Sequence, residues 1–293
     1  MKTQENKTDR SISKKLFISN GLFLLALLGI ARRILQAKAI LPLFLPAWLF
    51  WLLEIVLVIV ATGFRWAAEK VAEDQIFFPE MQRLFDAVQL DQTAGFGKED
   101  IEGADLFDIE DVNSSFLLQG MYQGMPFQFG EVRIHAAIGF LLPIPVTAFK
   151  GYYLKLYLPE SLPCTVKIFE RPWKSTPGIC KLVRSNTPGD VLTGKEAFDK
   201  DFQVVTGDPA PAAGILSDEF ISSLLKADEL AKANTYFALT GKEFYIAIEG
   251  GRGFLTLGWF KALKPGYIRK KYLSNIQFLT NMIKTGESFP TKY

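Results

Sequence analysis

Side chains that could perform chemistry together are scarce in this sequence. There is a single histidine, His135, and the two cysteines, Cys164 and Cys180, are not spaced as a CxxC pair. No GxxxxGK[ST] phosphate loop, GxSxG nucleophile elbow or DxDxDG calcium loop is present. We therefore expect no catalytic residue, no cofactor and no metal ligand, and we favour a protein that is not an enzyme.

Glu54 is the acidic residue with the most unusual setting, because it lies inside a long apolar run. A carboxylate in such a run is costly to insert into a membrane and is favoured there as the neutral acid. Its functional interpretations are a proton or ion relay, or a polar contact between the protomers of a homo-oligomer. We favour a structural interpretation, in which the neutral acid is hydrogen-bonded to Ser19 or Asn20.

Asp208 is the second candidate functional position. It precedes Pro209, and aspartate in this place forms turns by accepting backbone N–H bonds. An acid or ligand role would need a partner, and the sequence offers none. His135 ends a strand pattern and is expected to be a packed or edge side chain. The basic run 269–271 is expected on a solvated helix face, the alternative being contact with anionic lipid.

Two nearly uncharged apolar runs dominate the N-terminal part of the chain, and Glu54 lies in the second of them. Residues 39–63 are long enough to cross a hydrocarbon core of about 30 Å as a helix, and residues 16–31 reach about 24 Å. We expect a transmembrane hairpin over 16–63, preceded by a disordered tail at 1–15 and followed by stalk helices at 64–90. The alternative is that the first run lies in the interface and only the second run spans.

Basic residues near these runs bear on the side of the membrane that the rest of the chain occupies. Five Lys or Arg precede the first run, three lie between the runs and two follow the second. A hairpin with both ends inside places seven cations in the cytoplasm against three outside, as the positive-inside rule prefers. A single span would place eight against two and put the domain outside. We expect a multi-pass protein of the cell membrane with its soluble domain in the cytoplasm, where two unpaired cysteines are also common.

Beyond residue 90 the pattern changes to short strands and a few helices. Four runs rich in aromatic and β-branched residues, 116–122, 127–136, 146–158 and 164–169, predict strands, with a tight turn at Gln123-Gly124. A helix is predicted over 218–233 with Ser217 as its N-cap, then a hairpin over 235–249 and a last helix over 266–284. Residues 99–111 are acidic and are expected to form a solvated loop or edge. The predicted fold class is α+β, with packed helices on a mixed or antiparallel sheet over 91–293.

Several segments of this soluble half are similar to the bacterial membrane family of domain of unknown function 3137, over roughly residues 120–260. Residues 149–153, Phe-Lys-Gly-Tyr-Tyr, resemble the family's F-x-G-x-Y/F strand. Residues 196–204 resemble its E-x-F-x-x-x-F-x-V segment, and 245–248 its Y-I-A-I strand. Asp208, Ala212 and Phe220 fit a further run, in which Ala213 and Gly214 replace the family's usual Arg and Tyr. The resemblance implies a two-helix hairpin before the domain and implies no activity.

These observations favour a membrane-anchored, non-catalytic binding or scaffold domain. Its expected partners are the lipid bilayer and a membrane or envelope protein, with self-association as a further alternative. A net charge of +2 argues against binding to nucleic acid. The alternative function is an enzyme or transporter accessory that acts on lipid or an envelope precursor.

Overall fold

The chain folds into two compact units in the computed structural model. Unit 1 comprises residues 1–81 and 255–275, and unit 2 comprises residues 82–254 and 276–293. The structure describes residues 2–37, 47–138, 144–171, 191–250, 253–257 and 266–289. Residues 172–190, which include Cys180, lie outside these ranges, and of the segment between the two apolar runs only residues 32–37 are described.

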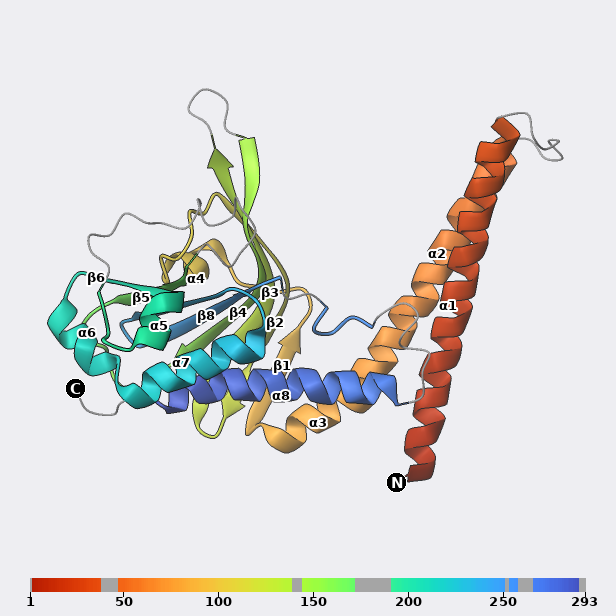
Figure 1. Ribbon diagram of the computed structural model, residues 1–293. Coiled ribbons are helices and arrows are strands. Elements are labelled where there is room, and N and C mark those ends of the chain that lie inside the picture. The colour runs from red at the N-terminus through yellow and green to blue at the C-terminus, as the bar shows by residue number, and fades with distance from the viewer. Residues whose placement is uncertain are drawn as a thin grey trace. The chain divides into compact units, whose positions relative to one another are not determined.

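Unit 1 is built on two long antiparallel helices, α1 (Lys2–Ala37) and α2 (Ala47–Ala72), which Figure 1 shows side by side. Their buried residues recur at three-, four- and seven-residue intervals, as in a left-handed helical pair. On α1 these are Ile12, Leu16, Ser19 and Ala26, and on α2 they are Glu54, Ala61 and Ala68. The Ser19 hydroxyl donates to the Ala61 carbonyl at 2.8 Å, which fixes the level of one helix against the other.

A π-helical turn follows α2 directly. This turn (Glu73–Phe77) leads into α3 (Phe78–Leu84), and Pro79 is the second residue of α3. Proline has no N–H and crowds the preceding turn, so a wider turn just before it relieves both conflicts. Unit 1 also contains the first half of α8 (Tyr267–Glu287), whose second half belongs to unit 2.

Unit 2 contains an open, eight-stranded antiparallel sheet. Its spatial order is β1-β2-β3-β4-β8-β7-β5-β6. The strands are β1 (Ala87–Asp91), β2 (Asp111–Tyr122), β3 (Met125–Ile138), β4 (Ile144–Tyr157), β5 (Val166–Glu170), β6 (Phe202–Thr206), β7 (Thr235–Thr240) and β8 (Glu243–Glu249). Its helices are α4 (Lys98–Glu102), α5 (Glu196–Asp201), α6 (Pro209–Ile215) and α7 (Asp218–Ala231). This arrangement confirms the predicted α+β class.

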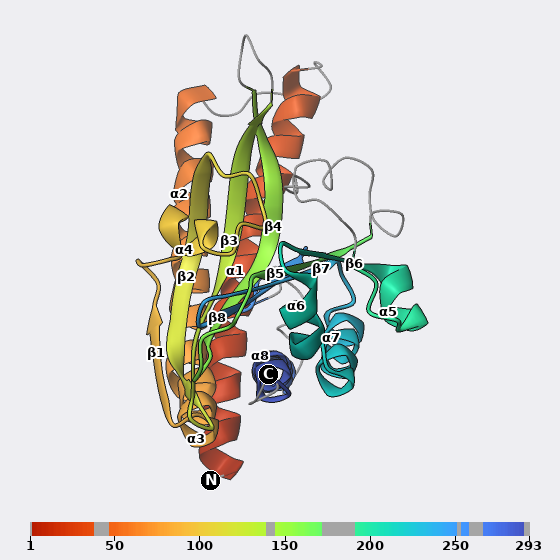
Figure 2. The ribbon, with the colours of Figure 1, turned by 90° about the vertical axis from the view of Figure 1, so that its left-hand side faces the viewer.

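Both faces of the sheet are covered. Helix α7 and the second half of α8 lie on one face, where Phe220 packs 5.6 Å from Phe244 and Phe278 packs 6.1 Å from Tyr152, as ring centroids (Figure 2). The segment containing α4 covers the other face. It contributes buried apolar side chains from Phe96, Ile101, Ala104, Leu106 and Phe107 to a core with the tyrosines of β4, β7 and β8.

Three predicted elements differ from the structure. The expected disordered tail at 1–15 is helical from Lys2, because the segment has no proline and Ile12 and Leu16 continue the buried stripe. The helix expected to reach residue 90 ends at Leu84, and residues 87–91 pair with β2 as an edge strand. The acidic stretch 99–111 contains α4, because apolar residues between the acids bury themselves on the sheet.

Candidate functional site: an apolar helix pair with a polar collar

The outward faces of α1 and α2 carry an extensive exposed apolar surface. The helical stretches 10–31 and 51–84 each contain an 18-residue window that is long and apolar enough to cross a membrane, and only 22% and 17% of those two windows are buried in the structure. A core helix of a soluble protein is mostly buried, so the low burial favours two candidate membrane-spanning helices over two core helices. The exposed large side chains are Phe17, Leu24, Leu25, Leu27, Leu28 and Ile30 on α1, and Trp48, Leu49, Trp51, Leu52, Leu53, Ile55, Val56, Val58, Ile59, Val60, Phe64 and Trp66 on α2.

Glu54 lies in the contact between these two helices. It is 5% exposed, and neither of its carboxylate oxygens has a hydrogen-bond partner. Ala26 lies seven residues after Ser19 on α1, and Glu54 lies seven residues before Ala61 on α2. Because the two helices are antiparallel, Ala26 and Glu54 are at the same level, about two helical turns from the Ser19–Ala61 bond. The expected hydrogen bond between Glu54 and Ser19 or Asn20 is therefore not formed, because Ser19 lies too far along the helix and donates to Ala61.

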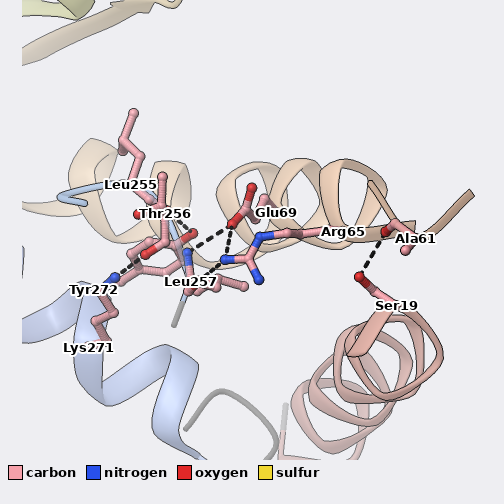
Figure 3. A network of polar contacts seen from close by, with 9 residues as sticks. All are labelled: Ser19, Ala61, Arg65, Glu69, Leu255, Thr256, Leu257, Lys271 and Tyr272. Atoms are coloured by element: carbon pink, nitrogen blue, oxygen red, sulfur yellow. Dashed lines mark hydrogen bonds and ion pairs between the residues drawn. The ribbon is translucent and has the colours of Figure 1, made fainter. Parts of the chain in front are cut away.

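A collar of polar contacts joins α2 to residues 255–257 and to α8 within unit 1 (Figure 3). Arg65 lies 3.2 Å from the Glu69 carboxylate and donates to the Leu257 carbonyl, while the Leu257 N–H donates to Glu69 at 3.0 Å. On α8, the Tyr272 hydroxyl donates to the Leu255 carbonyl at 3.0 Å and Lys271 donates to the Thr256 carbonyl.

The charged groups of this collar are partly buried. Burial lowers the pKa of Lys271; the Glu69 carboxylate opposes this shift, and the Arg65 guanidinium adds to it. The neighbouring Arg269 pairs with the buried Glu80 at 2.5 Å. Two members of the basic run 269–271 are thus used inside unit 1, and Lys270 is the exposed one. The collar has no local sequence signature, because it joins segments about 190 residues apart.

The remaining predicted positions lie in unit 2. Asp208 is exposed and stands at the N-cap of α6 without a side-chain capping bond, and its backbone N–H donates to Thr206 at 3.2 Å. His135 is half-buried on β3, opposite Thr147 of β4. Cys164 is a free, half-buried thiol. Among the described residues, no group of three or more His, Cys, Asp or Glu could hold a metal ion.

Unit 2 also contains a buried charged cluster that no sequence motif indicated. The Lys155 ammonium lies 2.8 Å from Glu243 and 3.9 Å from Asp100, and it lies over the rings of Tyr157 and Tyr245. Lys167 forms a similar ion pair with Asp105. The alternation of Tyr153, Lys155 and Tyr157 along β4 was the available signal, since it places a lysine on an inward face.

Together, the open antiparallel sheet and the N-terminal helix pair define an α+β protein with two candidate membrane-spanning helices. Residues 147–285 match the model of the family described as "Protein of unknown function (DUF3137)". All four sequence segments that carried the resemblance lie within this range, and the resemblance is confirmed.

The comparison with solved structures gives a crystal structure of the mycobacterial trehalose monomycolate transport factor A, TtfA. It is similar at 10% identity and a TM-score of 0.38, over 69% of this chain and 89% of that chain. A similarity at this TM-score carries no argument about function. The comparison with curated proteins gives no match.

Proposed function

We propose that the chain is a membrane protein in which α1 and α2 cross the bilayer as a hairpin and hold the α+β domain at the cytoplasmic surface. There the domain acts as a non-catalytic binding or scaffold module for a membrane or envelope protein. The observation that carries this proposal is the exposed apolar surface of both helices, which water solvates at high cost and lipid solvates well.

The positions of charged residues along the hairpin support the same assignment. Lys15 lies four residues before Ser19 on α1, and Arg65 lies four residues after Ala61 on the antiparallel α2. The two cations are therefore at the same height along the helix pair, next to the exposed Trp66. Lysine, arginine and tryptophan are enriched at membrane interfaces. Glu54 is eleven residues further along α2, or about 16 Å at 1.5 Å per residue, which is close to the middle of a hydrocarbon core of about 30 Å.

Extraction from membranes tests the proposal. The native chain is expected to stay in the pellet after washing with alkaline carbonate. Replacing Leu24 and Leu28 together with lysine should prevent stable insertion, because each lysine costs a few kcal/mol within the hydrocarbon core. Leu192→Lys is the matched control, since Leu192 is 72% exposed and belongs to unit 2. Release of the native chain by carbonate would refute the hairpin.

The scaffold role has its own test, which is co-purification of the native chain from its membrane with identification of partners by mass spectrometry. The enzyme alternative predicts a turnover that is lost in a well-folded Asp208→Ala variant. We expect no such loss, since Asp208 is exposed and makes no side-chain capping bond. A turnover abolished by this change would favour the enzyme instead.

A further inference from the structure

The open sheet of unit 2 has two edge strands, and they differ in how they are covered. At the β6 edge, the Val191 N–H donates to the Val204 carbonyl at 3.0 Å, so a neighbouring segment of the chain occupies part of this edge. At the opposite edge, β1 pairs with β2 and, among the described residues, with no other strand (Figure 2). The outer N–H and C=O groups of an edge strand can pair with a further strand. β1 is therefore the strand at which the sheet can be extended.

β1 lacks the residues that keep many edge strands from pairing. Lysine, proline and β-bulges are common devices, because they repel, block or twist away an incoming strand. β1 contains neither lysine nor proline, and its register with β2 runs without a shift over all five residues. Its one charged residue, Asp91, ends the strand and accepts from the N–H groups of Thr93 and Ala94 in the turn that follows, at 2.8 and 2.9 Å. The edge is therefore regular and open to a partner strand.

A row of apolar side chains crosses the sheet and ends at β1. In this row, each residue is directly opposite the next one on the neighbouring strand. Its first members, from β1 to β8, are Leu90, Leu118, Phe129, Leu154 and Ile246. The last four of these are at most 1% exposed, whereas Leu90 is only half-buried, as is Val88 on the same face of β1. The apolar face of the sheet is thus incomplete at this edge, and a further strand with apolar residues here would complete it.

The sequence of β1 is complementary to itself in one register. When two copies run antiparallel about a two-fold axis at Gln89, all five residues of one strand pair with all five of the other. Val88 is then opposite Leu90 of the second copy, which gives each half-buried side chain an apolar neighbour. Asp91 is opposite Ala87, so within the paired strands no carboxylate is opposite another. Gln89 is opposite itself, and its amide can both donate and accept, so two identical side chains satisfy each other.

We propose that unit 2 associates with a second copy of itself through β1, so that two eight-stranded sheets join into one antiparallel sheet. The self-complementary register favours a second copy over a strand of another protein. The Gln119 side chain donates to Gln89 at 3.4 Å, and the pairing continues this row of amides across the axis. Five residues from each copy are too few to bury the about 1,200 Å² of a stable interface, so the dimer is weak and forms where the chain is concentrated. All residues involved belong to unit 2, so the inference is independent of the transmembrane hairpin.

Cysteine cross-linking tests the proposed axis. In the full chain, with Cys164 and Cys180 replaced by serine, Gln89→Cys should form a disulfide-linked dimer under mild oxidation, because directly opposite Cα atoms are about 4.5 to 5.5 Å apart, within the range that a disulfide bridges. Ala87→Cys is the matched control and should stay monomeric, since Ala87 is also exposed but is four residues, or about 13 Å along the strand, from the same residue of the second copy. Equal cross-linking of both variants would overturn the proposal. So would the absence of a dimer in a Gln89→Cys chain whose thiol reacts with maleimide.

Lysine substitution tests the register by charge. Gln89→Lys puts two ammonium groups opposite each other at the axis, whereas Ala87→Lys puts the same group opposite Asp91 of the second copy. By sedimentation of the full chain in detergent at low ionic strength, we expect Gln89→Lys to weaken dimerisation about fivefold or more and Ala87→Lys to leave it unchanged or strengthen it. Thermal unfolding at low protein concentration should be unchanged in both variants, because both positions are exposed. Equal weakening by the two lysines would overturn the register, and with it the self-pairing.

Photo-cross-linking in the native membrane distinguishes a second copy from a strand of another protein. A benzophenone maleimide is attached to the Gln89→Cys chain, and the products are identified by mass spectrometry after digestion with trypsin. Residues 84–98 form the tryptic peptide that contains β1, and we expect this peptide joined to itself. A cross-link to a different protein would assign the edge to that protein and overturn the self-pairing. The absence of any cross-link at β1 would refute it as well.

Discussion

At the scale of single residues, the lysines of the sheet interior show how unit 2 neutralises buried charge. The side chains of Lys155 and Lys167 are 8% and 9% exposed, and each pairs with a carboxylate that water still reaches. Burial lowers the pKa of Lys155, but the bond to Glu243 and the negative charges around it raise that pKa more, so the net shift is upward. These groups hold the α4 segment on the sheet and are satisfied by each other, which is the behaviour of a structural cluster.

Replacing Lys155 with methionine tests this interpretation through pH. The raised pKa in the folded state means that the stabilisation by Lys155 is complete below its unfolded pKa of about 10.4 and is lost as the pH rises through the folded value. We expect Lys155→Met to cost about 1 to 2 kcal/mol at pH 8, a value reduced for the exposure of Glu243. The difference from the native chain should shrink by pH 11, as measured by denaturant unfolding. A stability difference between the two chains that grows with pH would contradict the upward shift of the Lys155 pKa.

Glu54 raises the opposite question, since its buried carboxyl group has no hydrogen-bond partner. Glutamine keeps the size and the polar character of the glutamate side chain, so Glu54→Gln should leave expression and oligomer size unchanged. Glu54→Leu should stabilise the hairpin by about 1 to 3 kcal/mol in detergent unfolding, because it removes an unsatisfied polar group from an apolar contact. A Gln variant that inserts and assembles normally but loses a measurable ion flux would show that Glu54 is a relay.

At the scale of elements, local patterns in the sequence were sufficient where local interactions determine the structure. The turn at Gln123-Gly124 has φ of 51° and 80°, as a tight hairpin turn requires, and the Ser217 hydroxyl accepts the Phe220 N–H as predicted. Phe198 and Phe202, which are four residues apart, stack with their ring centroids at 5.0 Å. Strand β1 could not be predicted in this way, because its edge pairing with β2 is a long-range contact that overrides a helical pattern.

Gly151, in the family-like segment 149–153, is required by the close approach of a neighbouring strand, which the sequence does not reveal. A Cβ atom on Gly151 would lie 1.9 Å from the Ile248 carbonyl oxygen of the neighbouring strand β8. Gly151→Ala would therefore separate β4 from β8, and we expect a loss of about 3 kcal/mol or more in denaturant unfolding. Gly207→Ala is the control, since nothing lies within 4 Å of its Cβ position, and it should change stability by less than about 0.5 kcal/mol. Equal stability of the two variants would mean that β4 and β8 are not packed this closely.

At the scale of the whole molecule, the candidate sites were harder to predict than the architecture. The apolar runs, the strands and the α+β class follow from periodicity and composition, which are properties of neighbouring residues. The collar of Arg65 and Glu69 depends on a contact between distant segments of the chain. The Lys155 cluster likewise joins β4 to Asp100 of α4 and to Glu243 of β8. Neither arrangement is encoded in the spacing of neighbouring residues.

The side of the membrane on which unit 2 lies is the prediction that belongs to this scale. The hairpin places seven cationic residues in the cytoplasm against three outside, and a single span would place the domain outside with eight against two. We expect the hairpin, so a membrane-impermeant maleimide should not label Cys164 in intact cells. Burial raises the pKa of the Cys164 thiol, with a bond to Thr206 opposing the shift and the charge of Asp208 adding to it, so we expect the native thiol to react slowly even in lysate.

A more reactive probe makes the result decisive. Lys226→Cys, in a chain whose two native cysteines are replaced by serine, puts a thiol on an exposed position of α7. It should react in lysate within minutes and stay unlabelled in intact cells. Because the same thiol is tested on both sides of one membrane, its accessibility reports topology and not burial. Labelling of this variant without permeabilisation would place the α+β domain outside the cell. That outcome would favour a single membrane span over the hairpin.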